Sequence, residues 1–153
     1  MRTVIALVVF LAITYAVAAI GGASSGPGEW YRSLVKPAWT PPPWVFGPAW
    51  GLLYTLMAVA AWLVWRRAGA APVALPLGLY AVQLVLNGLW SVLFFGLHSP
   101  GLAMVDIVLL WLAIVATTYA FWQVSTAAGI LFLPYLLWVT FASTLNYAIW
   151  RLN

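Results

Sequence analysis

Charged residues are scarce in this chain, which has six Lys or Arg and two Asp or Glu among 153 residues. An ordinary soluble domain has roughly 25% charged residues. Here the charged share is 5%, 66% of the residues are hydrophobic, and the mean hydropathy is +1.05. Because this small number of charged residues cannot cover a water-exposed surface, the sequence predicts an integral membrane protein. The net charge of +4 is scattered without a basic run, and we expect no nucleic-acid partner.

Residues that often make catalytic or metal sites are also missing. The absence of cysteine excludes thiol catalysis, disulfides and cysteine-based metal sites. The single histidine, His98, cannot form a histidine cluster. The two carboxylates, Glu29 and Asp106, lie far apart in the sequence, which gives little support to a paired acid/base mechanism. We therefore expect no metal and no cofactor.

Five apolar stretches divide the chain, and each approaches the ~20 residues that a helix needs to cross a bilayer. They are 4–20, 45–65, 75–97, 102–122 and 127–150. The sequence therefore predicts an all-α integral membrane protein, a bundle of five transmembrane helices in one domain of residues 1–153. The first connection, about 21–44, is long, whereas the other three are short. We expect helices joined by short connections to be antiparallel neighbours.

The first stretch permits a second interpretation. It begins near Arg2 and ends near Ala16-Val17-Ala18, which is similar to a signal-peptide cleavage site. Against cleavage, Ala12, Ala16 and Ala19 form a stripe of small residues that suits close helix packing. Orientation is left open, because the six cations divide three and three between the two sides of five spans.

Polar residues interrupt the third stretch on one helical face. Tyr80, Gln83, Asn87 and Trp90 recur at spacings of three and four residues. Asn87 lies near the middle of the span, where an unpaired amide is costly. Two interpretations remain open: an interhelical hydrogen bond, or a polar group that faces a ligand in an aromatic pocket.

The fifth stretch repeats this design around a proline. One face has Tyr135, Trp138, Ala142, Leu145 and Ile149. Pro134 should kink the helix or leave a carbonyl free, and Ala142 permits close approach of a helix or a flat ligand. Several tryptophans lie too deep within their spans for an interfacial belt: Trp90, Trp111 and Trp138. Such rings around one space would suit a planar macrocycle or a sterol.

Two further features concern single residues. Asp106 is the only acid within a span, and it has either a structural hydrogen-bonding role or a proton or ligand role. Near the C-terminus, Leu145, Tyr147 and Arg151 match the weak sterol pattern L/V-x-Y-x-K/R. Tyr147 and Arg151 are equally explained as an interfacial anchor and a snorkelling cation.

The segment Trp30–Trp50, WYRSLVKPAWTPPPWVFGPAW, contains four tryptophans and five prolines. Prolines preset backbone dihedrals, so this loop loses less entropy on ordering than a Gly/Ser loop would. We interpret it as a semi-rigid lid, with Tyr31 and Trp50 at its ends directed at one pocket. Arg32 and Lys36 face either water or an acidic group of a ligand.

These residues together resemble the TspO/translocator-protein family of tryptophan-rich sensory proteins. The first-loop matches are Trp30-Tyr31, Lys36-Pro37, Trp39, Pro41-Pro42, Trp44, Pro48 and Trp50. Further matches are LVLNGLWSVLFF at 84–95, Asp106, PYLLW at 134–138, LNY at 145–147 and Trp150-Arg151. The resemblance covers nearly the whole chain in order, and it favours an uncleaved first helix.

The resemblance implies a homodimeric five-helix bundle that binds porphyrins such as protoporphyrin IX, sterols and synthetic aromatic ligands. The ligand-binding positions that it implies are Tyr31, Trp50, Asn87, Trp90, Trp138 and Ala142, and Phe46 is added for its place at the loop–helix junction. Leu102 replaces a tryptophan of some members, and the basic tail of animal members is missing after Asn153. We therefore expect a bacterial member in the bacterial cell membrane.

Three functions remain at this point. The first is a membrane receptor or transport-associated protein for porphyrins and related tetrapyrroles. The second is an enzyme for light- and oxygen-dependent porphyrin breakdown, in which the indoles of Trp50 and Trp138 supply the oxidation chemistry. The third, a solitary transporter or channel, has little support because no internal repeat is evident and Asp106 is the only intramembrane charge.

Overall fold

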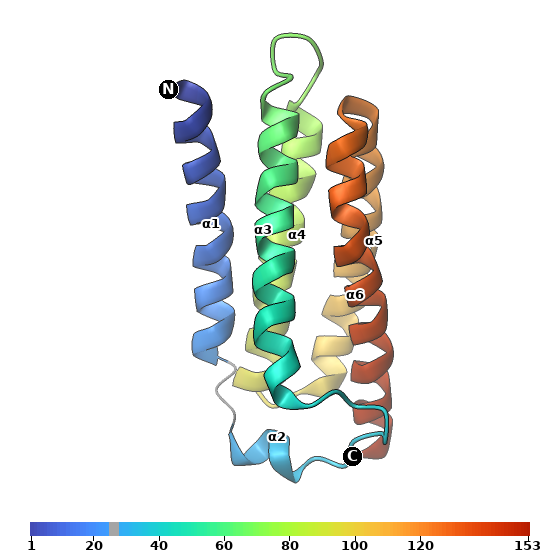
Figure 1. Ribbon diagram of the computed structural model, residues 1–153. Helices are drawn as coiled ribbons and strands as arrows, with labels where there is room; N and C mark the ends of the chain where they lie inside the picture. Colours follow the sequence, from blue (N-terminus) through green and yellow to red (C-terminus); the bar gives the residue numbers. More distant parts are fainter. Residues whose placement is uncertain (25–27) are drawn as a thin grey trace.

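Five long helices dominate the computed structural model, which describes residues 1–24 and 28–153 (Figure 1). They are α1 (Arg2–Ser24), α3 (Phe46–Trp65), α4 (Ala74–Ser91), α5 (Pro100–Val124) and α6 (Thr126–Leu152). Three short elements complete the described part: α2 (Glu29–Ser33), the 3₁₀ turn η1 (Pro43–Val45) and the π-helical turn η2 (Val92–Gly96). Within the described residues, five helical segments are long and apolar enough to cross a membrane, when η1 is counted with α3 and η2 with α4. This confirms the predicted all-α transmembrane architecture.

Local signals explain where several helices begin and end. Ser99 and Ser125 cap α5 and α6, because their side chains accept hydrogen bonds from Leu102 N–H and Ala128 N–H. Pro134 lies inside α6 without ending it. The first helix continues to Ser24, whereas the predicted span ended at residue 20 and the predicted connection began at about residue 21. Within that predicted connection, residues 25–27 lie outside the described residues.

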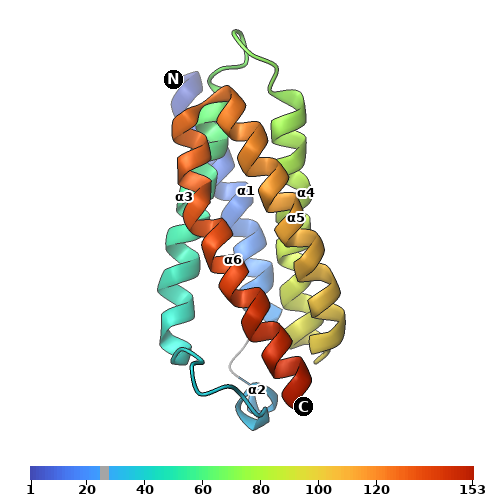
Figure 2. The same cartoon turned by 90° about the vertical axis from the view of Figure 1, so that its right-hand side faces the viewer.

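The helices form a ring in the order α1, α3, α6, α5, α4 (Figure 2). The expectation of antiparallel neighbours holds for α4–α5 and α5–α6 but is wrong for α3 and α4, which barely touch. The first helix lies between them: Trp62 Nε1 on α3 donates to Thr3 O at 2.7 Å, and Thr14 on α1 bonds the Tyr80 hydroxyl on α4. These bonds and apolar packing hold α1 between α3 and α4, the two helices that residues 66–73 connect.

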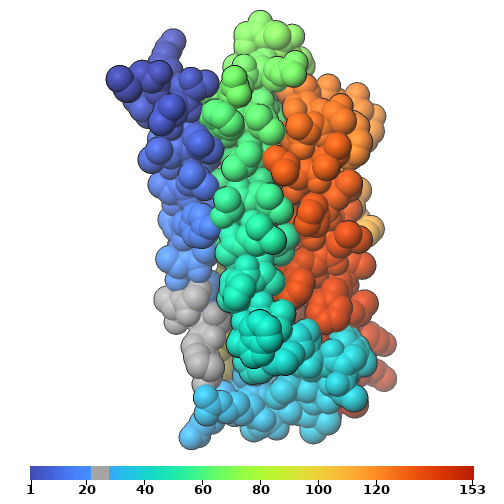
Figure 3. Space-filling view, viewed as in Figure 1, coloured from blue at the N-terminus to red at the C-terminus, as the bar shows by residue number. Residues whose placement is uncertain are grey.

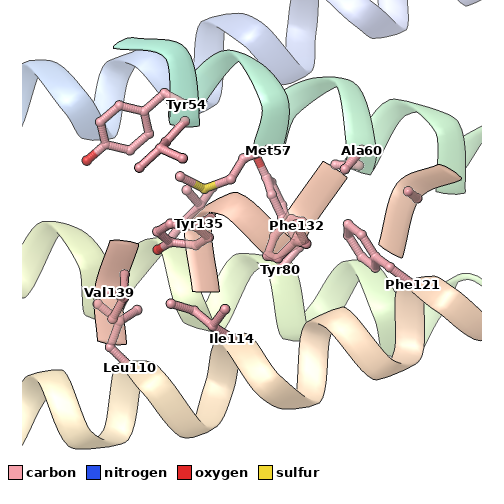
Figure 4. Packing of buried hydrophobic residues seen from close by; sticks show 14 of the residues in the cluster. Tyr54, Met57, Ala60, Tyr80, Leu110, Ile114, Phe121, Phe132, Tyr135 and Val139 are labelled. Carbon is pink, nitrogen blue, oxygen red and sulfur yellow. The ribbon is translucent and has the colours of Figure 1, made fainter. Parts of the chain in front are cut away.

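The core of the bundle is aromatic and closely packed (Figure 4). Phe121, Phe132 and Tyr135 have no exposed surface, and Phe132 contacts both of the others edge to face. Small residues bring the backbones together: a Cβ on Gly129 of α6 would lie 2.4 Å from the Trp122 ring of α5. This packing fixes the positions of α5 and α6 relative to one another.

The first loop is attached to the end of the bundle that also holds the C-terminus (Figure 3). Trp30 of α2 stacks on His98 with ring centres 4.5 Å apart and planes 9° apart. Further along, Val35 exchanges two main-chain hydrogen bonds with the side chain of Asn153, at 3.0 and 2.9 Å. Trp39 packs on Phe141 of α6 at 5.8 Å. The loop is therefore held to the bundle at three separate points.

Candidate functional site: an aromatic centre between helices

A chain of hydrogen bonds joins α3, α4 and α6 in the middle of the bundle. The Tyr54 hydroxyl donates to Asn87 Oδ1 at 2.6 Å, and Asn87 Nδ2 donates to the Tyr135 hydroxyl at 2.8 Å. Tyr135 in turn donates to Gln83 Oε1 at 2.7 Å. All four side chains are buried. This geometry favours the interhelical interpretation of Asn87, because its amide oxygen and nitrogen already have partners.

A small inner cavity lies beside this chain. It is lined by Trp50, Asn87, Trp90, Ser91, Ile107, Leu110, Val139 and Ala142. Four of the seven expected ligand-binding residues therefore share one space. Its volume is about 10 Å³, roughly the space of a single water molecule. A planar macrocycle would fit only after neighbouring side chains moved.

Aromatic side chains of α3 and α6 pack against one another beside this cavity. Trp50 stacks on Tyr54 with ring centres 5.5 Å apart, and it meets Trp138 edge to face at 6.1 Å. Phe46 contacts the same Trp138 ring at 5.9 Å. Trp138 of α6 thus contacts two expected site residues of α3, Phe46 and Trp50, and aromatic rings of this kind offer electron-rich faces and positive edges to a flat ligand.

Trp138 differs from the other deep tryptophans in its hydrogen bonding. Trp90 Nε1 donates to Asn146 Oδ1 at 2.8 Å, and Trp111 Nε1 donates to Thr140 Oγ1 at 2.8 Å. The buried Nε1 of Trp138 has no partner among the described residues. A buried unsatisfied N–H costs roughly 1–3 kcal/mol, so a ligand atom that accepted a hydrogen bond from Trp138 Nε1–H would remove this cost.

An open groove lies on the outer side of Trp138, between α3 and α6. It is lined by Pro41, Ala49, Leu52, Leu53, Pro134, Leu137, Trp138 and Phe141. Its volume is about 520 Å³, within the range of small-molecule sites. Figure 3 looks onto the face where α3 and α6 lie side by side above the first loop. Leu52 and Leu137 are 61% and 72% exposed, so this groove opens toward the lipid.

Tyr31 lies apart from the other expected ligand-binding residues. Its ring packs on Phe95 of η2 at 5.7 Å, in a second hydrophobic cluster at the loop end of the bundle. Burial raises the pKa of the Tyr31 hydroxyl above its ordinary value, so this group stays neutral. Lys36 turns toward the loop itself, since Nζ donates to Tyr31 O at 2.7 Å and lies over the Tyr31 ring. Arg32 is exposed.

The residues of the sterol pattern do not form one surface. Leu145 is buried with Phe94 and Ala103, whereas Tyr147 is half exposed and Arg151 is exposed. Tyr147 and Arg151 lie one turn apart on the outer face of α6, as the anchor interpretation requires. Of the three residues of the sterol pattern, only Tyr147 and Arg151 are therefore accessible to a molecule in the bilayer.

Asp106 is buried in α5 with 3% of its surface exposed. Both carboxylate oxygens lack a hydrogen-bond partner within residues 1–24 and 28–153. In the same part of the chain, no three His, Cys, Asp or Glu side chains lie close enough to hold a metal ion.

Sequence reasoning missed Tyr54 and most of the groove residues. Tyr54 lies four positions after Trp50, one helical turn along the same face of α3, and this spacing could have identified it. Leu52, Leu137 and Phe141 gave no comparable signal, because exposed apolar residues are ordinary on any transmembrane helix.

Comparisons with known proteins agree with this architecture. Residues 5–151 match the model of the TspO/MBR family. Protein CrtK of Rhodobacter capsulatus is 46% identical over 142 residues, which cover 92% of this chain and 89% of that protein. The human translocator protein is 48% identical over 127 residues, covering 82% of this chain and 75% of that protein. The tryptophan-rich sensory protein of Cereibacter sphaeroides is 46% identical over 132 residues, covering 86% and 82%.

The extent of these matches identifies the family. The bacterial relatives and the five apolar helices support the predicted location, a bacterial cell membrane. The chain is a multi-pass membrane protein, and it belongs to the TspO/MBR family.

Proposed function

We propose that this protein is a membrane receptor or transport-associated protein that binds porphyrins and related planar tetrapyrroles. The observation on which the proposal chiefly rests is the aromatic group of Phe46, Trp50 and Trp138 beside an unpartnered indole N–H in the described part of the bundle. A porphyrin offers a flat π surface for these rings and acceptor atoms for that N–H. Ala142 adds a small surface that a flat ligand can approach.

The polarity of the surroundings supports the same ligand class. The groove residues are all apolar, and the inner cavity adds only Asn87 and Ser91 to its apolar lining. Sugars and ions need several convergent polar groups, so an apolar planar molecule fits these surfaces better. Arg32 is exposed at the loop end and is available to a propionate group.

Titration of purified protein with protoporphyrin IX tests the proposal. The Soret band of the porphyrin should shift saturably, and Trp138→Phe should weaken binding about 3–10-fold, because one hydrogen bond is worth roughly 0.5–1.5 kcal/mol. Trp65→Phe is the matched control: Trp65 is the last residue of α3 and lines neither the groove nor the inner cavity, so the affinity of this variant should stay within about twofold of wild type. The absence of a saturable shift would exclude this function.

The second candidate is an enzyme for light- and oxygen-dependent porphyrin breakdown. The contacts of Trp50 with Trp138 and Tyr54 favour it, because oxidisable rings in contact can supply electrons to an excited porphyrin. Illumination of the porphyrin complex in air should then give a new product spectrum, which Trp138→Phe reduces and which disappears in the dark or under argon. Binding with an unchanged porphyrin spectrum after illumination would leave only the receptor function.

Two partner expectations remain predictions. A sterol would contact Tyr147 and Arg151 on the outer face of α6. The expected homodimer has exposed small residues available on α1, since Ala12, Ala16 and Ala19 all lie on its outer surface.

A further inference from the structure

The inner cavity is closed on most sides by contacts that resist opening. Tyr54, Asn87 and Tyr135 bond α3 to α6 through α4, and Tyr54 lies one helical turn after Trp50 along α3. Buried hydrogen bonds of this kind are costly to break inside an apolar bundle. At the other end, the first loop is held by Trp30, Val35 and Trp39. The open groove lies at a third boundary, between α3 and α6 at Trp138.

Trp138 lies between the outer groove and a residue that lines the inner cavity. One part of its surface lines the outer groove, and its ring meets Trp50, which lines the inner cavity. The groove and the cavity have no lining residue in common. Displacement of the Trp138 ring would therefore extend a groove of about 520 Å³ as far as Trp50, a residue of the cavity wall.

The bonds that hold other tryptophan rings in place are missing at Trp138. Trp62, Trp90 and Trp111 each donate Nε1–H to a neighbouring helix, and these bonds fix the ring orientation. No described residue accepts a bond from Trp138, so only packing holds its rotamer. Pro134, one turn earlier on α6, also lines the groove and lacks the backbone N–H that would complete the helix there.

We propose that the α3–α6 groove is a lateral entry site for planar apolar ligands dissolved in the bilayer, and that Trp138 is the gate between this groove and the inner cavity. The occupant is the planar tetrapyrrole of the proposed function, on which this inference rests. The ligand enters sideways from the lipid, displaces the Trp138 ring, and supplies the acceptor that its N–H lacks. The first loop stays docked during entry.

Groove-filling variants test this route. Ala49→Trp places a large ring in the groove, and Ala81→Trp makes the same change on the exposed face of α4. Leu137→Trp is a second groove variant, with Leu109→Trp on the exposed face of α5 as its control. Each protein is reconstituted into liposomes and rapidly mixed with protoporphyrin IX, and the association rate is measured from the Soret shift.

Both groove variants should associate at least about tenfold more slowly than their controls, because a gating step limits the rate when the path is blocked. Melting temperatures of the four variants show whether each is folded. Association rates of Ala49→Trp and Leu137→Trp within twofold of their controls, with saturable binding by all, would overturn lateral entry while leaving porphyrin binding intact. Failure of the wild type to bind would instead refute the proposed function.

Discussion

Tyr135→Phe tests whether the buried hydrogen-bond chain stabilises the bundle. The hydroxyl of Tyr135 accepts from Asn87 Nδ2 at 2.8 Å and donates to Gln83 Oε1 at 2.7 Å, in a side chain with no exposed surface. The substitution removes only this oxygen atom. It leaves two buried amide groups without that partner, and lipid cannot replace it.

The expected magnitude follows from the number of bonds lost. Interhelical hydrogen bonds in a membrane protein average about 0.6 kcal/mol and reach about 1.7 kcal/mol. Loss of two such bonds should lower the free energy of unfolding by about 1–3 kcal/mol. At roughly 3 °C per kcal/mol, the melting temperature in detergent should fall by about 3–9 °C. Tyr54→Phe removes one bond of the same chain, so its effect should be about half as large.

A matched control separates this effect from the loss of any hydroxyl. Tyr119 is 69% exposed, and Tyr119→Phe should change the melting temperature by no more than about 2 °C. The second check removes a stranded group: adding Gln83→Leu to Tyr135→Phe should recover part of the lost stability, because Gln83 Oε1 has lost its donor and Nε2 bonds only the Met57 sulfur at 3.8 Å. Equal melting temperatures for Tyr135→Phe and Tyr119→Phe would refute the reasoning.

Two further predictions concern the loop end of the molecule. Asn153→Ala removes both hydrogen bonds to Val35. Hydrogen exchange of the Val35 amide should therefore become about tenfold faster, while the melting temperature changes little. An unchanged exchange rate would contradict the view that the Asn153 side chain holds the loop. Leu145→Ala should lower the free energy of unfolding by about 2–5 kcal/mol, because Leu145 is 7% exposed in the second cluster, whereas Tyr147→Ala should have little effect on thermal unfolding. Similar melting temperatures for these two variants would contradict the division of the sterol pattern between core and surface.

The spans were predictable because length and hydropathy are local properties of the chain. Every predicted apolar stretch corresponds to a helix with similar bounds. The faces of α4 and α6 followed from spacing alone, and Gln83, Asn87 and Tyr135 do lie together. The neighbour relation of α3 and α4 was wrong because it depends on α1, whose contacts with both are long-range.

The expected site was only partly brought together by the fold. Trp50, Asn87, Trp90 and Ala142 share the inner cavity, while Trp138 faces the groove and Tyr31 packs near η2. Periodicity can place these residues on helical faces. It cannot give the rotations and crossing points of the helices, which decide which faces meet.

By itself, the sequence determined that this is a membrane protein of five helices with a proline- and tryptophan-rich loop, because composition and local periodicity are enough for both. Only the tertiary structure decided which indole N–H groups find acceptors, how small the inner cavity is, and where the bundle opens to lipid. These properties depend on contacts between residues far apart in the chain. Trp90 and Trp138 look alike in sequence, yet only Trp90 lies within reach of an acceptor, Asn146, on another described helix.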